Sequence, residues 1–161
     1  MMAVLILNYK QMVSITRTTS ENPDFTSLVT LLDADLKIRD GEDHEFYAQI
    51  NKTAILNNAI VCYQNNIAVG CGAFREIDTK TAEIKRMFVS PDFRGKGIAS
   101  RILVDLELWA TELNYSQTIL ETGINQPEAI ALYKKLGYTI TENYGQYVGV
   151  ENSVCMKKVL K

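Results

Sequence analysis

Residues 81–113 constrain the fold of this chain more than any other segment. The stretch TAEIKRMFV (81–89) has the composition and alternation of a strand, and it runs into Pro91, which cannot donate to a sheet ladder. The glycine-rich sequence RGKG (94–97) follows and leads into residues 97–113, where apolar positions recur with helical spacing. The segment is therefore predicted to form a strand, a tight glycine loop and a long helix.

The loop between this strand and this helix is a candidate anion site. Gly95 and Gly97 allow a tight turn, and N–H groups at the start of a helix attract anions. Arg94 and Lys96 add positive charge. The spacing fails the P-loop pattern, and it fits a dinucleotide fingerprint poorly because Ser100 stands where that pattern has glycine. A pyrophosphate cradle of another kind and a plain glycine turn both remain open.

Composition indicates an ordinary globular domain. The chain has 161 residues, of which 47% are hydrophobic and 22% charged, and its formal net charge is −2. This length suits one domain with its own core. We therefore expect a single domain over residues 1–161, with residues 1–11 as a candidate N-terminal extension. The small net charge gives no general electrostatic reason to expect a nucleic-acid partner or an anionic membrane.

The cysteine and histidine content argues against a metal centre. Cys62, Cys71 and Cys155 form no CxxC pair, and His44 is the only histidine, so a zinc cluster is not expected. Reduced, buried thiols are typical of a cytoplasmic protein. The apolar start of the chain lacks the basic region and cleavage site of a signal peptide, and no apolar run approaches the roughly 20 residues of a membrane span. A cytoplasmic protein without membrane contact is therefore expected.

The whole chain predicts an α+β domain with a mixed, mostly antiparallel central sheet flanked by helices. Asn65 and Asn66 mark a hairpin, and three adjacent antiparallel strands are expected around it. The expected strands are residues 13–18, 59–64, 67–74, 81–89, 118–122, 138–141 and 152–160. The expected helices lie within residues 22–39, 40–52, 97–113 and 126–137.

Two motifs at the expected separation resemble the GNAT superfamily of N-acetyltransferases. That family has a strand ending in V-x-P, then [Q/R]-x-x-G-x-[G/A], which Arg94, Gly97 and Ala99 match. Further on it has N-x-x-A-x-x-x-Y-x-x-x-G-[F/Y]. The matching residues here are Ala129, Tyr133, Gly137 and Tyr138. The asparagine of the second motif falls on Gln126, with Asn125 one residue earlier.

The resemblance implies a GNAT-like acyl-CoA N-acyltransferase fold with acetyl-CoA as cosubstrate. The pyrophosphate is expected in the loop, and the pantetheine arm along strand residues 87–89, where the sheet splits opposite strand 118–122. The amide of either Asn125 or Gln126 would contact the cofactor arm, or Gln126 only caps a helix; these alternatives stay open. The implied cofactor-binding residues are Met87, Phe88, Val89, Arg94, Gly95, Lys96, Gly97, Ile98, Ala99, Ser100, Asn125 and Gln126.

The resemblance also implies direct attack of an amine on the thioester in a ternary complex. Tyr133 is the candidate acid for the departing thiolate, although its place in an apolar helical stripe also suits a core residue. Glu83 is the candidate base, with pairing to Lys85 or to a cross-strand charge as the alternative. Strand alternation predicts that Glu83, Lys85, Met87 and Val89 share one face.

The acceptor amine is only loosely indicated. The acceptor side is expected from residues 33–52 and 142–153. The acidity of the first segment would suit a cationic small-molecule or peptide amine, but a solvated charged helix and loop is the favoured interpretation. Tyr144 and Tyr147 either wall the acceptor pocket or pack across the last hairpin. The family resemblance suggests a homodimer. The alternatives to an enzyme are a non-catalytic acyl-CoA-binding or sensing module and a protein-interaction domain without a cofactor.

Overall fold

A computed structural model describes residues 11–51 and 55–161, so the candidate extension lies, apart from Gln11, outside the described residues. The strands are β1 (Val13–Thr18), β2 (Asn58–Gln64), β3 (Ile67–Glu76), β4 (Thr81–Val89), β5 (Gln117–Gly123), β6 (Thr139–Thr141) and β7 (Ser153–Val159). The helices are α1 (Pro23–Asp40), α2 (His44–Asn51), α3 (Ile98–Glu112) and α4 (Pro127–Lys135). The predicted order of elements is confirmed.

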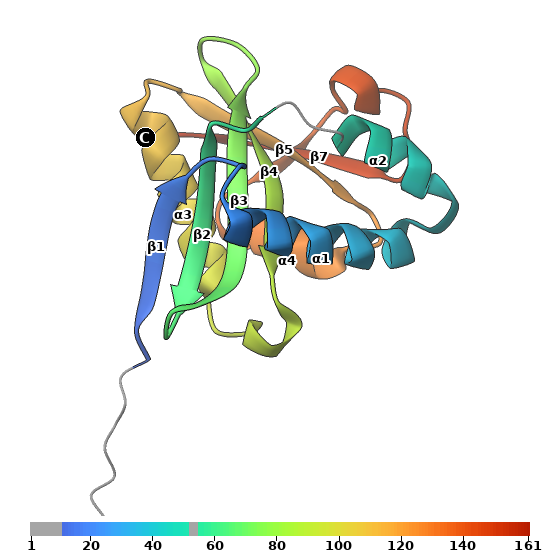
Figure 1. The fold of residues 1–161 in the computed structure, drawn as a ribbon. Coiled ribbons are helices and arrows are strands. Elements are labelled where there is room, and N and C mark those ends of the chain that lie inside the picture. Colours follow the sequence, from blue (N-terminus) through green and yellow to red (C-terminus); the bar gives the residue numbers. More distant parts are fainter. Residues whose placement is uncertain (1–10, 52–54) are drawn as a thin grey trace, which may run out of the picture.

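The strands form one seven-stranded sheet in the order β1-β2-β3-β4-β5-β7-β6 (Figure 1). All neighbouring strands are antiparallel except β4 and β5, which run parallel. That parallel ladder joins only Thr81–Glu83 to Gln117–Ile119. Beyond these three pairs the two strands are no longer hydrogen-bonded to each other, so the expected split of the sheet is confirmed.

Helices cover both faces of the sheet. Phe25, Leu28 and Leu32 of α1 pack on one face with one set of strand side chains, and α3 packs on the other face with a second set that also reaches α4. Figure 1 shows α1 crossing the sheet on the side opposite α3. Within the described residues, no helix is long and apolar enough to cross a bilayer.

Two glycines in β3 bring α3 close to the sheet. A Cβ at Gly70 would lie 2.9 Å from the Ile102 Cδ1 atom, and one at Gly72 would lie 2.9 Å from both the Ile102 Cγ2 and the Leu106 Cδ1 atoms. Real side chains do not tolerate such distances, so a larger residue at either position would push α3 outward. The close packing fixes the first turn of α3 beside the end of β4.

A bulge in β4 changes which side chains share a face. Arg86 has a φ of 59°, which is rare for a residue other than glycine, and the register with β3 shifts at this point. Met87 and Val89 consequently pack on the α3 side, whereas the Lys85 amine points to the other side, 3.5 Å from the Tyr147 hydroxyl. The prediction that Glu83, Lys85, Met87 and Val89 share one face is therefore wrong, because the extra residue reverses the alternation.

Candidate active site

A cleft of about 450 Å³ lies between the end of β4, the glycine loop and α4. Its walls include Met87, Phe88 and Val89 of β4, and most residues from Phe93 to Ser100. The opposite wall is formed by α4, with Leu32 and further residues of α1 completing it. The two sequence motifs therefore face each other across one cavity.

The glycine loop is built to leave backbone exposed in this cleft. Gly95 and Gly97 have φ values of 74° and 77°, which favour glycine, and no atom lies within 4 Å of a Cβ placed on either residue. Helix α3 starts at Ile98 without a side-chain cap and without an acidic residue in its first turn. The N–H groups of this first turn and the positive end of the helix dipole are therefore suited to an anion.

Of the two loop cations, one lines the cleft. Arg94 lies in the cleft wall, where its Nε donates to the Val89 carbonyl at 2.8 Å and its guanidinium lies 5.7 Å from the Phe88 ring centroid. The Lys96 amine instead lies 5.2 Å from the Phe93 ring centroid, and Lys96 is not in the cleft wall. Within the loop, positive charge for a bound anion therefore comes from backbone N–H groups and from Arg94, which also lies 3.8 Å from Asp35.

The last part of β4, which lines the cleft, has an unpaired edge on the side that faces β5. Because the ladder to β5 stops at Glu83, the backbone from Ile84 onward has no strand partner on that side among the described strands. The Phe88 ring is buried in the core under α1, so Phe88 presents mainly backbone to the cleft. This edge is suited to pairing with the amides of an extended ligand.

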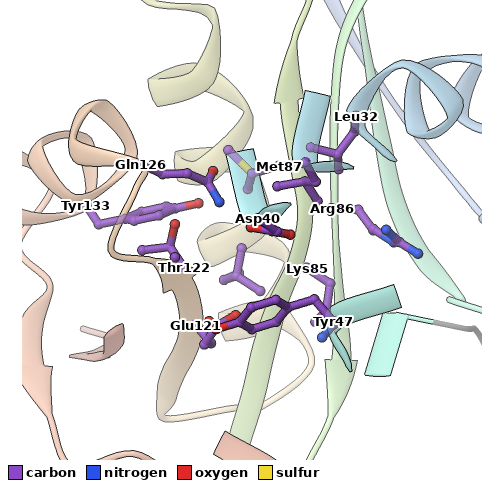
Figure 2. Close-up of a pocket in the computed structure, with 13 residues that line it drawn as sticks. Leu32, Asp40, Tyr47, Lys85, Arg86, Met87, Glu121, Thr122, Gln126 and Tyr133 are labelled. Atoms are coloured by element: carbon purple, nitrogen blue, oxygen red, sulfur yellow. The ribbon is translucent and has the colours of Figure 1, made fainter. Parts of the chain in front are cut away.

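A second pocket of about 90 Å³ opens in the gap between β4 and β5 (Figure 2). Leu32, Met87, Gln126 and Tyr133 line both this pocket and the larger cleft. In Figure 2 the Tyr133 hydroxyl and the Gln126 amide both end in the gap, facing Met87. The two cavities therefore meet at these side chains.

Tyr133 lies at this junction. It belongs to α4, is 6% exposed, and its ring packs edge-on against Tyr138 with 5.8 Å between the centroids. Burial raises the pKa of the Tyr133 hydroxyl, with the charge of Glu121 adding to the effect. The hydroxyl therefore stays protonated at neutral pH and can donate a hydrogen bond.

The two neighbouring amides behave differently. Gln126 occupies the N-cap position of α4, but its side chain makes no capping hydrogen bond and lines both cavities. The Asn125 amide donates to the Arg39 carbonyl at 3.4 Å, and Asn125 lines neither cavity. Of the two, Gln126 is placed to meet a ligand.

Glu83 is buried and already engaged. Its carboxylate lies 2.6 Å from the Arg75 Nε, accepts a hydrogen bond of 2.9 Å from the Tyr144 hydroxyl, and lies 3.8 Å from the Lys85 amine. Arg75 is its direct cross-strand neighbour. Glu83 lines neither cavity, which favours the pairing alternative left open by the sequence.

Glu121 of β5, which the sequence reasoning did not single out, lines the smaller pocket. Its Oε1 atom is buried without a hydrogen-bond partner among the described residues. Burial raises the pKa of this carboxyl to about 7, while a hydrogen bond from Ser153 and the charge of Lys85 oppose the shift. The available signal was a lone charge inside the apolar strand sequence TILET.

The acidic segment contributes one carboxylate to the smaller pocket, that of Asp40. Burial raises the pKa of Asp40. Asp33 instead pairs with Arg86 at 2.8 Å, and Asp43 accepts a hydrogen bond from Asn152. Most of the acidity from 33 to 52 therefore lies outside this pocket.

Besides Tyr133, this pocket has a second aromatic side chain in its wall, Tyr47, whose hydroxyl shares a hydrogen bond of 2.9 Å with Ser153. Tyr144 and Tyr147 pack edge-on with 5.6 Å between their ring centroids and line neither cavity. The structure therefore favours a packing role for these two tyrosines over a role as walls of the acceptor pocket.

The cysteines stand apart from both cavities. Cys62, Cys71 and Cys155 are buried free thiols, and burial raises the pKa of each one. A raised thiol pKa disfavours the nucleophilic thiolate. Across residues 11–51 and 55–161, no group of three or more His, Cys, Asp or Glu could hold a metal ion.

Residues 21–138 match the model of the acetyltransferase (GNAT) family. The chain is 40% identical over 103 residues to an IAA acetyltransferase of Azospirillum brasilense, a segment covering 63% of this chain and 67% of that protein. It is 34% identical over 100 residues to the uncharacterized N-acetyltransferase YsnE of Bacillus subtilis, a segment covering 61% of this chain and 66% of that protein. The matched segment thus spans about two thirds of these relatives.

Solved structures agree with this match. A Klebsiella pneumoniae protein assigned as an acyl-CoA N-acyltransferase has a TM-score of 0.78 and 30% identity, covering 93% of this chain and 99% of that one. A GNAT acetyltransferase from Elizabethkingia anophelis, solved with acetyl-CoA bound, has a TM-score of 0.66 and 20% identity, covering 92% of this chain and 98% of that one. At this identity, the similarity supports the fold alone. With the family match spanning most of the chain, the protein belongs to the GNAT family of acetyl-CoA-dependent N-acetyltransferases.

Proposed function

We propose that this chain acts as a single domain that acetylates a primary amine of a small molecule or peptide by direct attack in a ternary complex. The observation that carries the proposal is the meeting of two cavities at Met87, Gln126 and Tyr133. The larger cleft is suited to the coenzyme, which when bound supplies the activated thioester. The smaller pocket is suited to the amine. Homodimer formation stays a prediction.

The cleft fits acetyl-CoA through backbone more than through side chains. The open turn at Gly95 and Gly97 and the uncapped start of α3 would hold the diphosphate, with Arg94 adding charge. The free edge of β4 at Met87–Val89 would pair with the pantetheine amides. The Gln126 amide, without a capping role, would contact the cofactor arm.

Glu121 is the base that we propose for the amine. An alkyl amine has a pKa of about 10.4, so well below 1% is neutral at pH 7 and a proton acceptor is needed. A carboxyl with a pKa of about 7 is partly ionised at this pH, Glu121 lines the pocket beside the junction, and its Oε1 atom has no hydrogen-bond partner among the described residues. Glu83 lacks a free face for this role, because Arg75 and Tyr144 occupy its carboxylate.

Tyr133 would stabilise the leaving thiolate by hydrogen bonding. A thiolate of this kind has a conjugate pKa of about 8.5, whereas burial holds the pKa of Tyr133 above its usual range. Complete proton transfer from Tyr133 to the thiolate would therefore be thermodynamically unfavourable. The Tyr133 hydroxyl donates a hydrogen bond to the thiolate and keeps its proton for most of the step. Backbone N–H groups at Met87–Val89 would stabilise the charge that develops on the acetyl oxygen.

A thiol-release screen tests the proposed function. The protein is incubated with acetyl-CoA and a panel of polyamines, amino acids, aminoglycosides and peptides with free N-terminal or lysine amines, and free CoA thiol is measured. We expect release well above hydrolysis with at least one class. Tight coenzyme binding without release from any amine would indicate a non-catalytic acyl-CoA-binding module, and no calorimetric heat with acetyl-CoA would indicate a cofactor-free domain.

Gly97→Glu is expected to abolish coenzyme binding. The new carboxylate would point into the anion site, where it repels a diphosphate and fills the open turn. Calorimetry with CoA measures the effect. The matched control is Gly149→Glu, because Gly149 has a similar φ of 78°, equally open surroundings, and no part in either cavity. Equal loss of affinity in both variants, or normal affinity in G97E, would refute the loop assignment.

Tyr133→Phe is expected to lower kcat about 10- to 1,000-fold with little change in KM, because one hydrogen bond to the leaving group is lost. Steady-state kinetics with the best acceptor measure this split. Tyr138→Phe is the control: the Tyr138 hydroxyl bonds to Thr118 at 2.8 Å and lines neither cavity. Y138F should lower stability while keeping kcat, and an unchanged kcat in Y133F would make Tyr133 a packing residue.

Glu121→Gln is expected to lower kcat/KM about 10²- to 10⁴-fold and to remove the rise of activity with pH near 7. Asp40, Glu83 and Lys85 also face this carboxyl, so the profile is compared with that of Glu83→Gln. E83Q should keep the rise of activity with pH near 7, although it breaks the ion pair with Arg75. Loss of this rise in E83Q but not in E121Q would assign the base to Glu83.

The same Glu121 variant predicts a change in stability with a definite sign. Because folding raises the pKa of Glu121, ionising this carboxyl destabilises the folded state as pH rises from about 4.5 to 7. E121Q should therefore unfold in urea at the same concentration as wild type at pH 4. At pH 8 it should be more stable by on the order of 1–3 kcal/mol. Equal stability at both pH values would contradict the shift.

A further inference from the structure

The smaller pocket, where we place the acceptor, contains a buried lysine. The Lys85 side chain is 11% exposed and lines the pocket together with Asp40, Tyr47 and Glu121. Figure 2 shows Lys85 coming from β4 and Glu121 from β5, on opposite sides of the gap. A cation in a pocket that binds an amine suits an acceptor that also carries a negative charge.

The protein neutralises this lysine only in part. Its nearest carboxylate is Glu83, 3.8 Å away, but Glu83 also lies 2.6 Å from Arg75. Glu83 is therefore shared between two cations, and the Lys85 amine also interacts with the charge of Glu121 across the gap. Burial lowers the pKa of Lys85, and an anion beside it would stabilise the charged form.

The opposite wall of the pocket carries acidic side chains. Asp40 and Glu121 both reach the pocket, and an oxygen of Asp40 would lie 3.8 Å from a Cβ at Gly123 on the β5 side. A polyamine or a lysine side chain would satisfy these carboxylates but would place a second cation beside Lys85. A molecule with an amine and a carboxylate two bonds apart satisfies both walls. The volume of about 90 Å³ also favours a small molecule.

Resting on the proposed function, we infer that the acceptor is a free amino acid. Its amine faces Glu121 and Asp40, and its carboxylate pairs with Lys85. Lys85 is thus a specificity-determining residue for the acceptor. A peptide N-terminus lacks a carboxylate at this distance from the amine and is acetylated less well.

The experiment compares each amino acid with its own primary amide, and adds diamines of similar length, in the thiol-release assay with wild-type protein. The amide keeps the amine and removes the negative charge. We expect the best amino acid to exceed its amide in kcat/KM by about 10- to 100-fold, as for one charge-assisted hydrogen bond. Lys85→Met should reduce this ratio to near one by lowering turnover of the amino acid.

Lys157→Met is the matched control, because Lys157 is an exposed strand lysine outside both cavities. It should keep the wild-type ratio. Amides or diamines that react as well as amino acids would overturn the inference and leave the proposed function standing, whereas no release from any amine would overturn both. A ratio unchanged in K85M would also overturn it. The acid–amide comparison needs only wild-type protein, so it decides the inference even if K85M fails to fold.

Discussion

The early end of the pairing between β4 and β5 is the constraint on which the rest of the site depends. After Glu83 and Ile119 the two parallel strands separate, although each stays paired to an antiparallel neighbour on its other side. The bulge at Arg86, whose guanidinium bonds to Asp33, turns β4 at the point of separation. A split sheet exposes backbone that a complete sheet would hide, and that backbone is the surface available to an extended coenzyme arm.

The same gap explains why ionisable groups with shifted pKa values gather there. Asp40, Lys85 and Glu121 come from three different elements, and burial disfavours the charged form of each one. Such groups are usually expelled from a sheet interior. The core beneath α3 includes residues of both strands, Ile84 of β4 and Leu120 of β5, and so stabilises the sheet around them. Clusters of this kind are typical of sites where protons are transferred.

The helices, the strands and the glycine loop could be predicted from the sequence, whereas Glu121, which we propose as the base, could not. Gly95, Gly97 and Tyr133 follow local motifs, and local motifs carry their geometry with them. Glu83 matched a family position, yet its cross-strand partner Arg75 neutralises it. For Glu121, the sequence offered only a charged residue in an apolar strand. Its Oε1 atom has no hydrogen-bond partner because of the tertiary structure, in which β4 and β5 stop pairing before they reach this residue.

The sequence by itself determined the order of strands and helices, the αL glycines of the loop and the spacing of the second motif, since these depend on periodicity and on backbone freedom within a few residues. Only the tertiary structure decided that β4 and β5 part after three pairs, that one extra residue at Arg86 reverses the faces of β4, and that Glu121, Lys85 and Tyr133 line the same gap. Strand register and burial are properties of contacts between distant segments, and no local pattern encodes them.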